Sequence, residues 1–215
     1  MMPAALLLDL DGTLLDTEPL HVEAHREHLH QHGIPVSDAE LWGNIGKGDR
    51  DFYVRLMERA GVAGDAAALV QGKTERLRGI YRARRVPWKS GAPALLDRCR
   101  AIGLTAMIVT SSDRITVACA LQASGGSGLH LRLCAEDVRR RKPDPEPYAL
   151  AARRLGLPPE RCWAVEDSPS GVASARAAGI GRVIAVPDRI AAADLRAAGA
   201  SHLLDDLHGL GAWLA

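Results

Sequence analysis

Short apolar runs alternate with longer amphipathic segments along most of the chain. Many of the longer segments end in a Gly followed by an apolar residue, which is typical of a helix end, because Gly accepts the left-handed backbone conformation there. The apolar runs between these segments are too short to cross a membrane and predict strands. The runs are residues 4–8, 105–110, 131–134, 163–165 and 182–186, and the helix ends lie at Gly33, Gly61, Gly103, Gly156, Gly179 and Gly199.

The alternation is regular from residue 87 onward, as in repeated βα units, and it predicts a parallel sheet. The interval before it has helical patterns and no convincing strand. These patterns lie at residues 19–32, 50–60 and 65–84. We therefore expect an α/β fold in which residues 1–16 and 87–215 form a doubly wound parallel sheet with its helices, and residues 17–86 form an inserted α-helical cap domain.

Composition and charge give no sign of a nucleic-acid or membrane partner. The chain has 215 residues, a formal net charge of +1 and 25% charged residues of both signs, whereas such partners select a strongly basic surface. The cysteines are widely spaced and form no C-x-x-C pair. This spacing favours reduced thiols in a cytoplasmic protein over a disulfide framework. The first apolar run starts too close to Met1 for a signal peptide to precede it. We expect a cytoplasmic protein that acts as a monomer.

The first apolar run ends in two carboxylates one residue apart, Asp9 and Asp11, and Gly12 follows at once. A buried parallel strand would deliver both carboxylates to the edge where open α/β sheets bind ligands. The pair can share a small cation such as Mg2+, or divide the tasks of nucleophile and proton carrier. An ordinary polar turn is the simpler alternative. An EF-hand does not fit, because Gly12 follows the second Asp directly and the downstream acidic ligand is missing.

Polar groups also follow the other predicted strands. The second strand runs into a helix start, where hydroxyls and free N–H groups bind anions such as phosphate. The loop after the third strand carries a lysine beside a proline that restricts the backbone, and the fourth strand ends in an acidic pair. These groups are Thr110 and Ser111, Lys142 beside Pro143, and Glu166 with Asp167. Each has an ordinary structural explanation, but together with the Asp pair they predict a metal and phosphate site.

In order and spacing, these groups resemble the four motifs of the haloacid dehalogenase-like hydrolase superfamily. The resemblance covers nearly the full chain, and the segment from Asp16 to Pro19 is similar to that of the phosphatase and β-phosphoglucomutase subfamily, which carries a helical cap after the first motif. The resemblance implies a Rossmannoid core and a phosphoester substrate. One residue departs from the pattern: Arg141 stands where the family usually has Gly before the Lys-Pro pair.

The resemblance also implies roles for the strand-end residues. Asp9 would attack phosphorus and form an aspartyl phosphate, while Asp11 would protonate the leaving oxygen and then accept a proton from water. For this, the pKa of Asp11 should rise from about 3.9. Thr110 and Lys142 would hold the transferring phosphoryl oxygens. The Mg2+ ligands would be Asp9, the backbone carbonyl of Asp11, and Asp167, with Glu166 nearby.

Several residues are candidates for substrate binding. Ser111 lies beside the second motif, and His21 lies just past the predicted entry to the cap. The segment around Lys47 and Arg50 indicates a flexible loop with two cations, and comparable loops in the family touch substrate. Lys73, on a predicted cap helix, is a further candidate, although a solvated helix face explains it equally well.

The sequence therefore predicts a Mg2+-dependent phosphatase that acts on a small phosphorylated metabolite, a sugar phosphate, through an aspartyl phosphate. A hexose phosphate mutase of the β-phosphoglucomutase type is the first alternative. The family's mutases tend to carry Lys-Asn where this chain has Asp113-Arg114, which favours the phosphatase. A phosphometabolite-binding protein without activity is the second alternative. We also expect the cap to close over Asp9 about hinges at residues 16–18 and 86–91.

Overall fold

The computed structural model describes residues 2–126 and 128–214. Its centre is a six-stranded parallel sheet in the order β3-β2-β1-β4-β5-β6. The strands are β1 (Ala5–Leu8), β2 (Thr105–Val109), β3 (Arg132–Leu133), β4 (Cys162–Glu166), β5 (Arg182–Ala185) and β6 (His202–Leu203). The first strand in the sequence thus lies inside the sheet between β2 and β4. The predicted α/β fold is confirmed.

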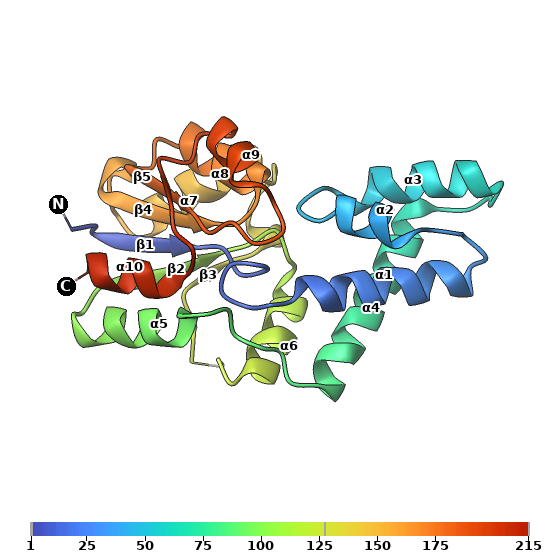
Figure 1. The fold of residues 1–215 in the computed structure, drawn as a ribbon, viewed down its shortest axis with the longest axis horizontal. Coiled ribbons are helices and arrows are strands. Elements are labelled where there is room, and N and C mark those ends of the chain that lie inside the picture. The colour runs from blue at the N-terminus through green and yellow to red at the C-terminus, as the bar shows by residue number, and fades with distance from the viewer. Residues whose placement is uncertain (1, 127, 215) are drawn as a thin grey trace.

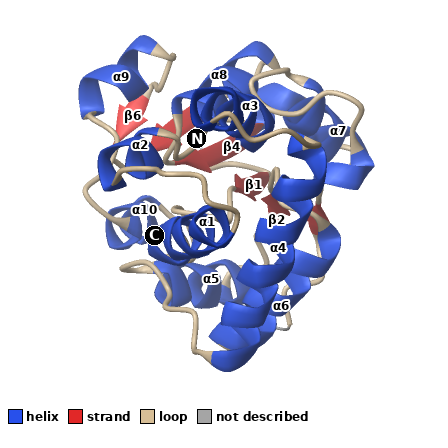
Figure 2. Ribbon diagram, turned by 90° about the vertical axis from the view of Figure 1, so that its right-hand side faces the viewer, coloured by secondary structure: helices blue, strands red, loops and turns tan. Residues whose placement is uncertain are grey.

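Helices cover both faces of this sheet (Figures 1 and 2). Along β1, Leu6 and Leu8 face the helices of one layer, while Ala5 and Leu7 face those of the other, because successive strand side chains point to opposite faces. Both faces are therefore apolar, as is expected of a buried parallel sheet. One layer holds α5 (Ala92–Ala101), α6 (Arg114–Ser124) and α10 (Leu207–Trp213); the other holds α7 (Glu146–Arg154), α8 (Pro169–Ala177) and α9 (Ala192–Ala197).

Four further helices lie together at one end of the molecule, beyond the carboxyl ends of the strands (Figure 1). They pack around a hydrophobic cluster of their own, which includes Leu29, Leu41 and Tyr53. They are α1 (Glu18–Gln31), α2 (Asp38–Gly43), α3 (Asp49–Ala60) and α4 (Ala66–Ala83). Two short 3-10 helices, at Ala135–Asp137 and Pro159–Arg161, complete the fold.

The chain crosses between these helices and the sheet at two adjacent segments. The backbone N–H of Asp16 donates to the carbonyl of Pro87 at 2.9 Å, and the N–H of Lys89 donates to the carbonyl of Leu14 at 2.9 Å. Away from these crossings, α4 also packs along α6. At that contact, Arg78 pairs with Asp113 at 2.7 Å.

The helix ends predicted from glycines are confirmed, because each of these glycines has a positive φ. They are Gly33, Gly61, Gly103, Gly156, Gly179 and Gly199. The pattern did not predict α2, β6 or α10, which are short segments of seven residues or fewer. No helix among the described residues is long and apolar enough to span a membrane.

The backbone of α10 lies very close to Gly91 at the start of α5. Gly91 and Gly125 share a φ of 80°, but a Cβ at Gly91 would lie 2.3 Å from the backbone nitrogen of His208, whereas a Cβ at Gly125 would meet nothing within 4 Å. Gly125→Ala should lower the free energy of unfolding by about 1 kcal/mol through left-handed strain alone. Gly91→Ala should cost about 1–3 kcal/mol more, because α10 must shift. Urea unfolding measures both, and equal losses would contradict the close contact.

Candidate active site

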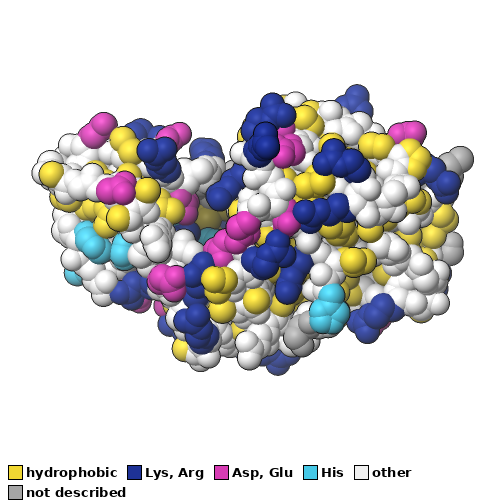
Figure 3. Space-filling view, turned by 180° about the vertical axis from the view of Figure 1, so that it is seen from behind, with side chains coloured by type: hydrophobic (Ala, Val, Ile, Leu, Met, Phe, Trp, Pro, Cys, Tyr) yellow, Lys and Arg dark blue, Asp and Glu magenta, His cyan; other side chains and the backbone are white. Residues whose placement is uncertain are grey.

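A cavity of about 570 Å³ lies between the carboxyl ends of the strands and the helices α1–α4. Figure 3 shows the molecule hollowed between its smaller and larger lobes, with acidic and basic side chains gathered at the edge of the hollow. The cavity is lined by most of the residues singled out in the sequence, namely Asp9, Asp11, His21, Lys47, Arg50, Lys73, Thr110, Ser111, Lys142 and Asp167. Glu166 lies directly behind this lining, fully buried at the end of β4.

A buried cation joins the strand ends. Lys142 Nζ lies 2.6 Å from Asp9 Oδ1 and 2.6 Å from Glu166 Oε1, and it also donates to the carbonyl of Val109 at 2.8 Å. These contacts connect β1, β2 and β4 through one ammonium group, so all three of its protons have acceptors. Unlike a solvated surface lysine, Lys142 is therefore held in one position.

Glu166 is also fixed by groups that the sequence did not reveal. The hydroxyl of Tyr148 donates to Glu166 Oε1 at 2.6 Å, and the hydroxyl of Ser168 donates to Oε2 at 3.1 Å. Tyr148 is fully buried, and its ring lies under the ammonium of Lys142 at 5.2 Å. Because both oxygens of Glu166 already accept hydrogen bonds, this carboxylate supports the site from behind.

Asp9, Glu166 and Asp167 each offer an oxygen atom within 4.8 Å of the others, and among the described residues they form the one cluster suited to a metal ion. No hydrogen bond from the described residues reaches the Oδ2 atoms of Asp9 and Asp167. Gly12 permits this approach, because a Cβ at its position would lie 2.1 Å from Asp167 Oδ2. Asp9 and Asp167 thus each keep a carboxylate oxygen without a hydrogen bond from the described residues, and carboxylate oxygens are the ligands that a hard divalent cation prefers.

Burial and like charges make these carboxylates costly to ionise. Burial raises the pKa of Asp9 to about 8, with Glu166 and Asp11 adding to the effect and Lys142 opposing it. Burial, followed by the charges of Asp9 and Glu166, raises the pKa of Asp167 well above its usual range. Burial alone would lower the pKa of Lys142, but the charges of Asp9 and Glu166 outweigh it and raise that pKa. One ammonium does not neutralise three carboxylates, so the site fits a divalent cation.

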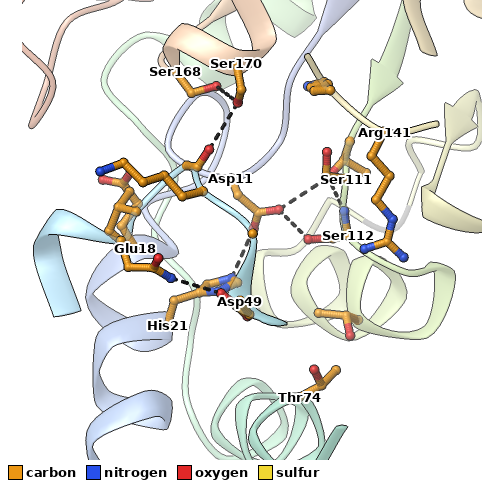
Figure 4. Close-up of a pocket in the computed structure, with 18 of the residues that line it drawn as sticks. Asp11, Glu18, His21, Asp49, Thr74, Ser111, Ser112, Arg141, Ser168 and Ser170 are labelled. Atoms are coloured by element: carbon orange, nitrogen blue, oxygen red, sulfur yellow. Dashed lines mark hydrogen bonds and ion pairs between the residues drawn. The ribbon is translucent and has the colours of Figure 1, made fainter. Parts of the chain in front are cut away.

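The surroundings of Asp11 differ from those of Asp9. Thr17 donates to its Oδ1 at 2.8 Å, and Ser112 donates to its Oδ2 at 2.7 Å. Thr110 lies 3.4 Å from the same Oδ2 and accepts the backbone N–H of Ser112 at 3.0 Å. His21 approaches from the other side, with Nε2 at 3.6 Å from Oδ1. Figure 4 shows Asp11 between His21 and the serines of the second motif.

These contacts correct the expected pKa of Asp11. Burial raises it, but the approach of His21 and the hydroxyl donors Ser112 and Thr17 outweigh burial, so that the pKa of Asp11 lies well below its usual range. The sequence suggested the opposite direction, because it did not show that three donors surround this carboxylate. In this arrangement Asp11 is ionised, which is the form that accepts a proton, and it must take up a proton before it can act as an acid.

A chain of polar contacts runs from Asp11 into the inserted helices. Lys73 is buried and donates to Asp49 Oδ2 at 2.9 Å, and its Nζ lies 3.3 Å from Nδ1 of His21. An ammonium can only donate, so Nδ1 is the acceptor in this contact, and Nε2 is the ring nitrogen that faces Asp11. His25 Nε2 lies 3.5 Å from Asp49 Oδ1, and burial lowers the pKa of His25 to about 4. This contact between Asp49 and His25 was not predicted from the sequence.

The remaining substrate-binding candidates lie at the rim of the cavity. Ser111 is exposed there, and its neighbour Ser112 makes the contact with Asp11. Lys47 is exposed on the segment between α2 and α3, and its Nζ donates to the carbonyl of Gly43 at 2.8 Å. This segment touches the sheet side where Ser170 donates to the carbonyl of Gly46 at 3.1 Å (Figure 4). Arg50 is also exposed, but it lies in the first turn of α3 and not in the expected loop.

Comparison with known proteins agrees with this geometry. The family model of haloacid dehalogenase-like hydrolases matches residues 3–179. Protein CbbY of Rhodobacter capsulatus is 34% identical over 89% of this chain and 91% of its own length, and hexitol phosphatase A of Escherichia coli is 33% identical over 84% and 81%.

Among solved structures, CbbY from Rhodobacter sphaeroides in complex with xylulose-(1,5)bisphosphate is 27% identical, covers 98% of this chain and 97% of its own, and superposes with a TM-score of 0.85. The family model and the curated relatives thus span most of the chain, including all four strand ends that line the cavity. The chain belongs to the haloacid dehalogenase-like hydrolase family.

Proposed function

We propose that this protein is a Mg2+-dependent phosphatase that hydrolyses a small phosphorylated metabolite, a sugar phosphate, through an aspartyl phosphate on Asp9. The observation that carries the proposal is the pair of carboxylates at the end of β1. Asp9 is fixed by the ammonium of Lys142, and Asp11, two residues on, is aimed into the same cavity by hydroxyl donors. The names of the relatives support a sugar phosphate, since one is a hexitol phosphatase and another binds a sugar bisphosphate.

The reaction takes two displacements at phosphorus. In the first, a carboxylate oxygen of Asp9 bonds to phosphorus while the ester bond breaks, and protonated Asp11 gives its proton to the leaving oxygen. In the second, ionised Asp11 takes a proton from water, the water oxygen bonds to phosphorus, and the acyl phosphate bond breaks to regenerate the Asp9 carboxylate. The contacts with His21, Thr17 and Ser112 stabilise the ionised Asp11 that the second displacement needs.

Mg2+ would be held by Asp9, Asp167 and the backbone carbonyl of Asp11, with Glu166 supporting Lys142 from behind. When bound, the ion supplies positive charge that keeps the carboxylates ionised and offsets the charge of the phosphoryl oxygens. Lys142 adds a second fixed cation on the side of Asp9, and Thr110 adds a hydroxyl at the end of β2. Phosphoryl transfer needs such positioning and charge neutralisation more than any other aid.

The surroundings of the second motif favour a phosphatase over a mutase. Asp113 caps α6 and pairs with Arg78 at 2.7 Å, and Arg114 pairs with Asp137 at 2.8 Å. Both side chains are thus occupied within the protein at the positions where the mutases of the family tend to carry Lys-Asn. His21 beside Asp11 is compatible with either reaction.

We propose that residues 17–86 act as a cap over a catalytic core formed by residues 1–16 and 87–215, with Ser111, His21, Lys47, Arg50 and Lys73 facing the substrate. The location of Lys47 and Arg50 at the cavity supports this proposal. Closure of the cap excludes water while the aspartyl phosphate forms, and reopening releases the product.

Replacing the nucleophile should separate fold from activity. Asp9→Asn keeps the volume of the side chain but removes the attacking oxygen, so we expect phosphate release to fall by about a thousandfold or more while the thermal unfolding midpoint stays near that of the parent. A panel of phosphorylated metabolites with Mg2+ present, read as free phosphate, measures the loss.

Two results would contradict the proposal. A parent chain that releases no phosphate from any member of the panel, yet is stabilised by one of them, would be a binding protein. Formation of glucose 6-phosphate from β-glucose 1-phosphate in place of free phosphate would identify a mutase.

Mg2+ should stabilise the protein, because it binds carboxylates that repel one another without it. At a hundredfold excess over the dissociation constant, the gain is about 2.7 kcal/mol. The pKa of Asp9 is raised to about 8, so protons compete with the ion below that pH, and the gain should be larger at pH 8 than at pH 5.5. Thermal unfolding with and without Mg2+ measures the gain. An undiminished gain in Asp167→Asn would place the ion elsewhere.

Lys47 and Arg50 should contribute to binding of the natural substrate more than to the chemical step. Lys47→Ala or Arg50→Ala removes a cation from the cap side of the cavity, so we expect KM for the best sugar phosphate to rise about tenfold. KM for p-nitrophenyl phosphate, which needs mainly the groups of the core, should rise far less. Equal increases for both substrates would place these residues outside substrate recognition.

A further inference from the structure

The cations that line the cavity fall into two groups. Lys142 and Lys73 are buried, and each contacts at least one carboxylate, at 2.6 Å and 2.9 Å respectively. Lys47, Arg50 and Arg141 also line the cavity, but none of them forms an ion pair with any residue between 2 and 126 or between 128 and 214. The first group is neutralised within the protein, whereas the second leaves positive charge facing the cavity.

Arg141 differs from Lys47 and Arg50 because the sheet side of the cavity provides it. Its neighbours in the sequence are already engaged: Arg140 pairs with Asp144 at 3.2 Å, and Lys142 binds Asp9 at 2.6 Å. The side chain of Arg141 makes no hydrogen bond within the described part of the chain. It is also the residue that replaces the Gly usual in the family. Arg141 thus adds an unpaired guanidinium on the sheet side of the cavity.

The position of Arg141 relative to Asp11 indicates what it faces. Arg141 lines the cavity together with Ser111 and Ser112, and Figure 4 draws its side chain across Asp11 from His21. Asp11 gives its proton to the leaving oxygen, so the organic part of a substrate must extend past Asp11, away from Asp9. The guanidinium of Arg141 therefore borders the space for the leaving group, while Lys142 serves the transferring phosphoryl group.

We propose that Arg141 determines specificity by binding a second anionic group of the substrate, so that the natural substrate carries a phosphate or carboxylate besides the phosphate that is cleaved. The inference rests on the proposed phosphatase function and narrows its substrate class. A guanidinium presents a planar set of donors that matches the two oxygens of a phosphate or carboxylate, and an arginine without a partner in a substrate cavity is free to make that match. Lys47 and Arg50 would approach the same substrate from the cap side.

The test compares sugar phosphates that differ in one anionic group. The comparison of fructose 1,6-bisphosphate with fructose 1-phosphate tests the effect of a second phosphate. The comparison of 6-phosphogluconate with glucose 6-phosphate tests the effect of a carboxylate. We expect the parent chain to have the lower KM for the two-anion member of at least one pair. Arg141→Ala should raise that KM about tenfold or more relative to its one-anion partner, and Arg141→Lys should recover part of the loss.

Arg140→Ala is the matched control, since it removes an adjacent exposed arginine that is paired with Asp144. Arg140→Ala should leave the ratio of KM for the two-anion member to KM for the one-anion member the same as in the parent chain. Equal losses for both members of a pair in Arg141→Ala would assign Arg141 to the transferring phosphoryl group, and an unchanged ratio would make it a solvated side chain. Either result overturns the proposal.

A binding measurement separates this inference from the proposed reaction. Calorimetry with the Asp9→Asn chain and Mg2+ gives dissociation constants for the same pairs without turnover, and adding Arg141→Ala should remove the preference for the two-anion member. If the parent chain hydrolyses none of the four compounds, the phosphatase proposal fails for substrates of these kinds. The ratio of the dissociation constants for the two members of a pair still decides the role of Arg141. A ratio that does not change on adding Arg141→Ala overturns the specificity proposal.

Discussion

The buried ammonium of Lys142 holds together a site whose other groups repel one another. A parallel sheet brings the carboxyl ends of its strands to one edge, and here those ends carry Asp9, Glu166 and Asp167 within a few ångströms. Ionised carboxylates in such a place are unfavourable unless cations accompany them. Lys142 supplies one positive charge and contacts two of the three carboxylates. The excess negative charge that remains is the physical reason why a divalent ion would fit this site.

The fold and the centre of the site could be predicted from the sequence because both depend on local signals. Apolar runs of strand length and glycines after helices gave the α/β alternation, and the family model confirms the resemblance drawn from the four motifs. Asp9, Thr110 and Asp167 meet at the cavity because each follows a strand of the parallel sheet, and the loop between β3 and α7 brings Lys142 to them. Their roles remain predictions, and the geometry supports them.

The supporting residues could not be predicted, because they act across long separations in the sequence. Tyr148 holds Glu166 from a neighbouring helix, and Ser112, rather than Ser111, turns toward Asp11. Asp49 and Lys73 meet only because α3 and α4 pack together. A tyrosine or aspartate on a helix has no pattern that distinguishes it from an ordinary core or surface residue. The predicted direction of the pKa shift of Asp11 was wrong, because the sequence does not show that His21, Thr17 and Ser112 surround this carboxylate.

The two crossings between the sheet and the inserted helices lie next to each other, joined by the hydrogen bond from Asp16 to Pro87. Viewed from the sheet, the whole insertion is one closed surface loop. The entropy of closing a loop grows only with the logarithm of its length, by about 0.6 kcal/mol for each doubling. Evolution can therefore lengthen, shorten or exchange the insertion while the strand ends keep their places, so that a lineage can acquire a new substrate without having to evolve its chemistry again.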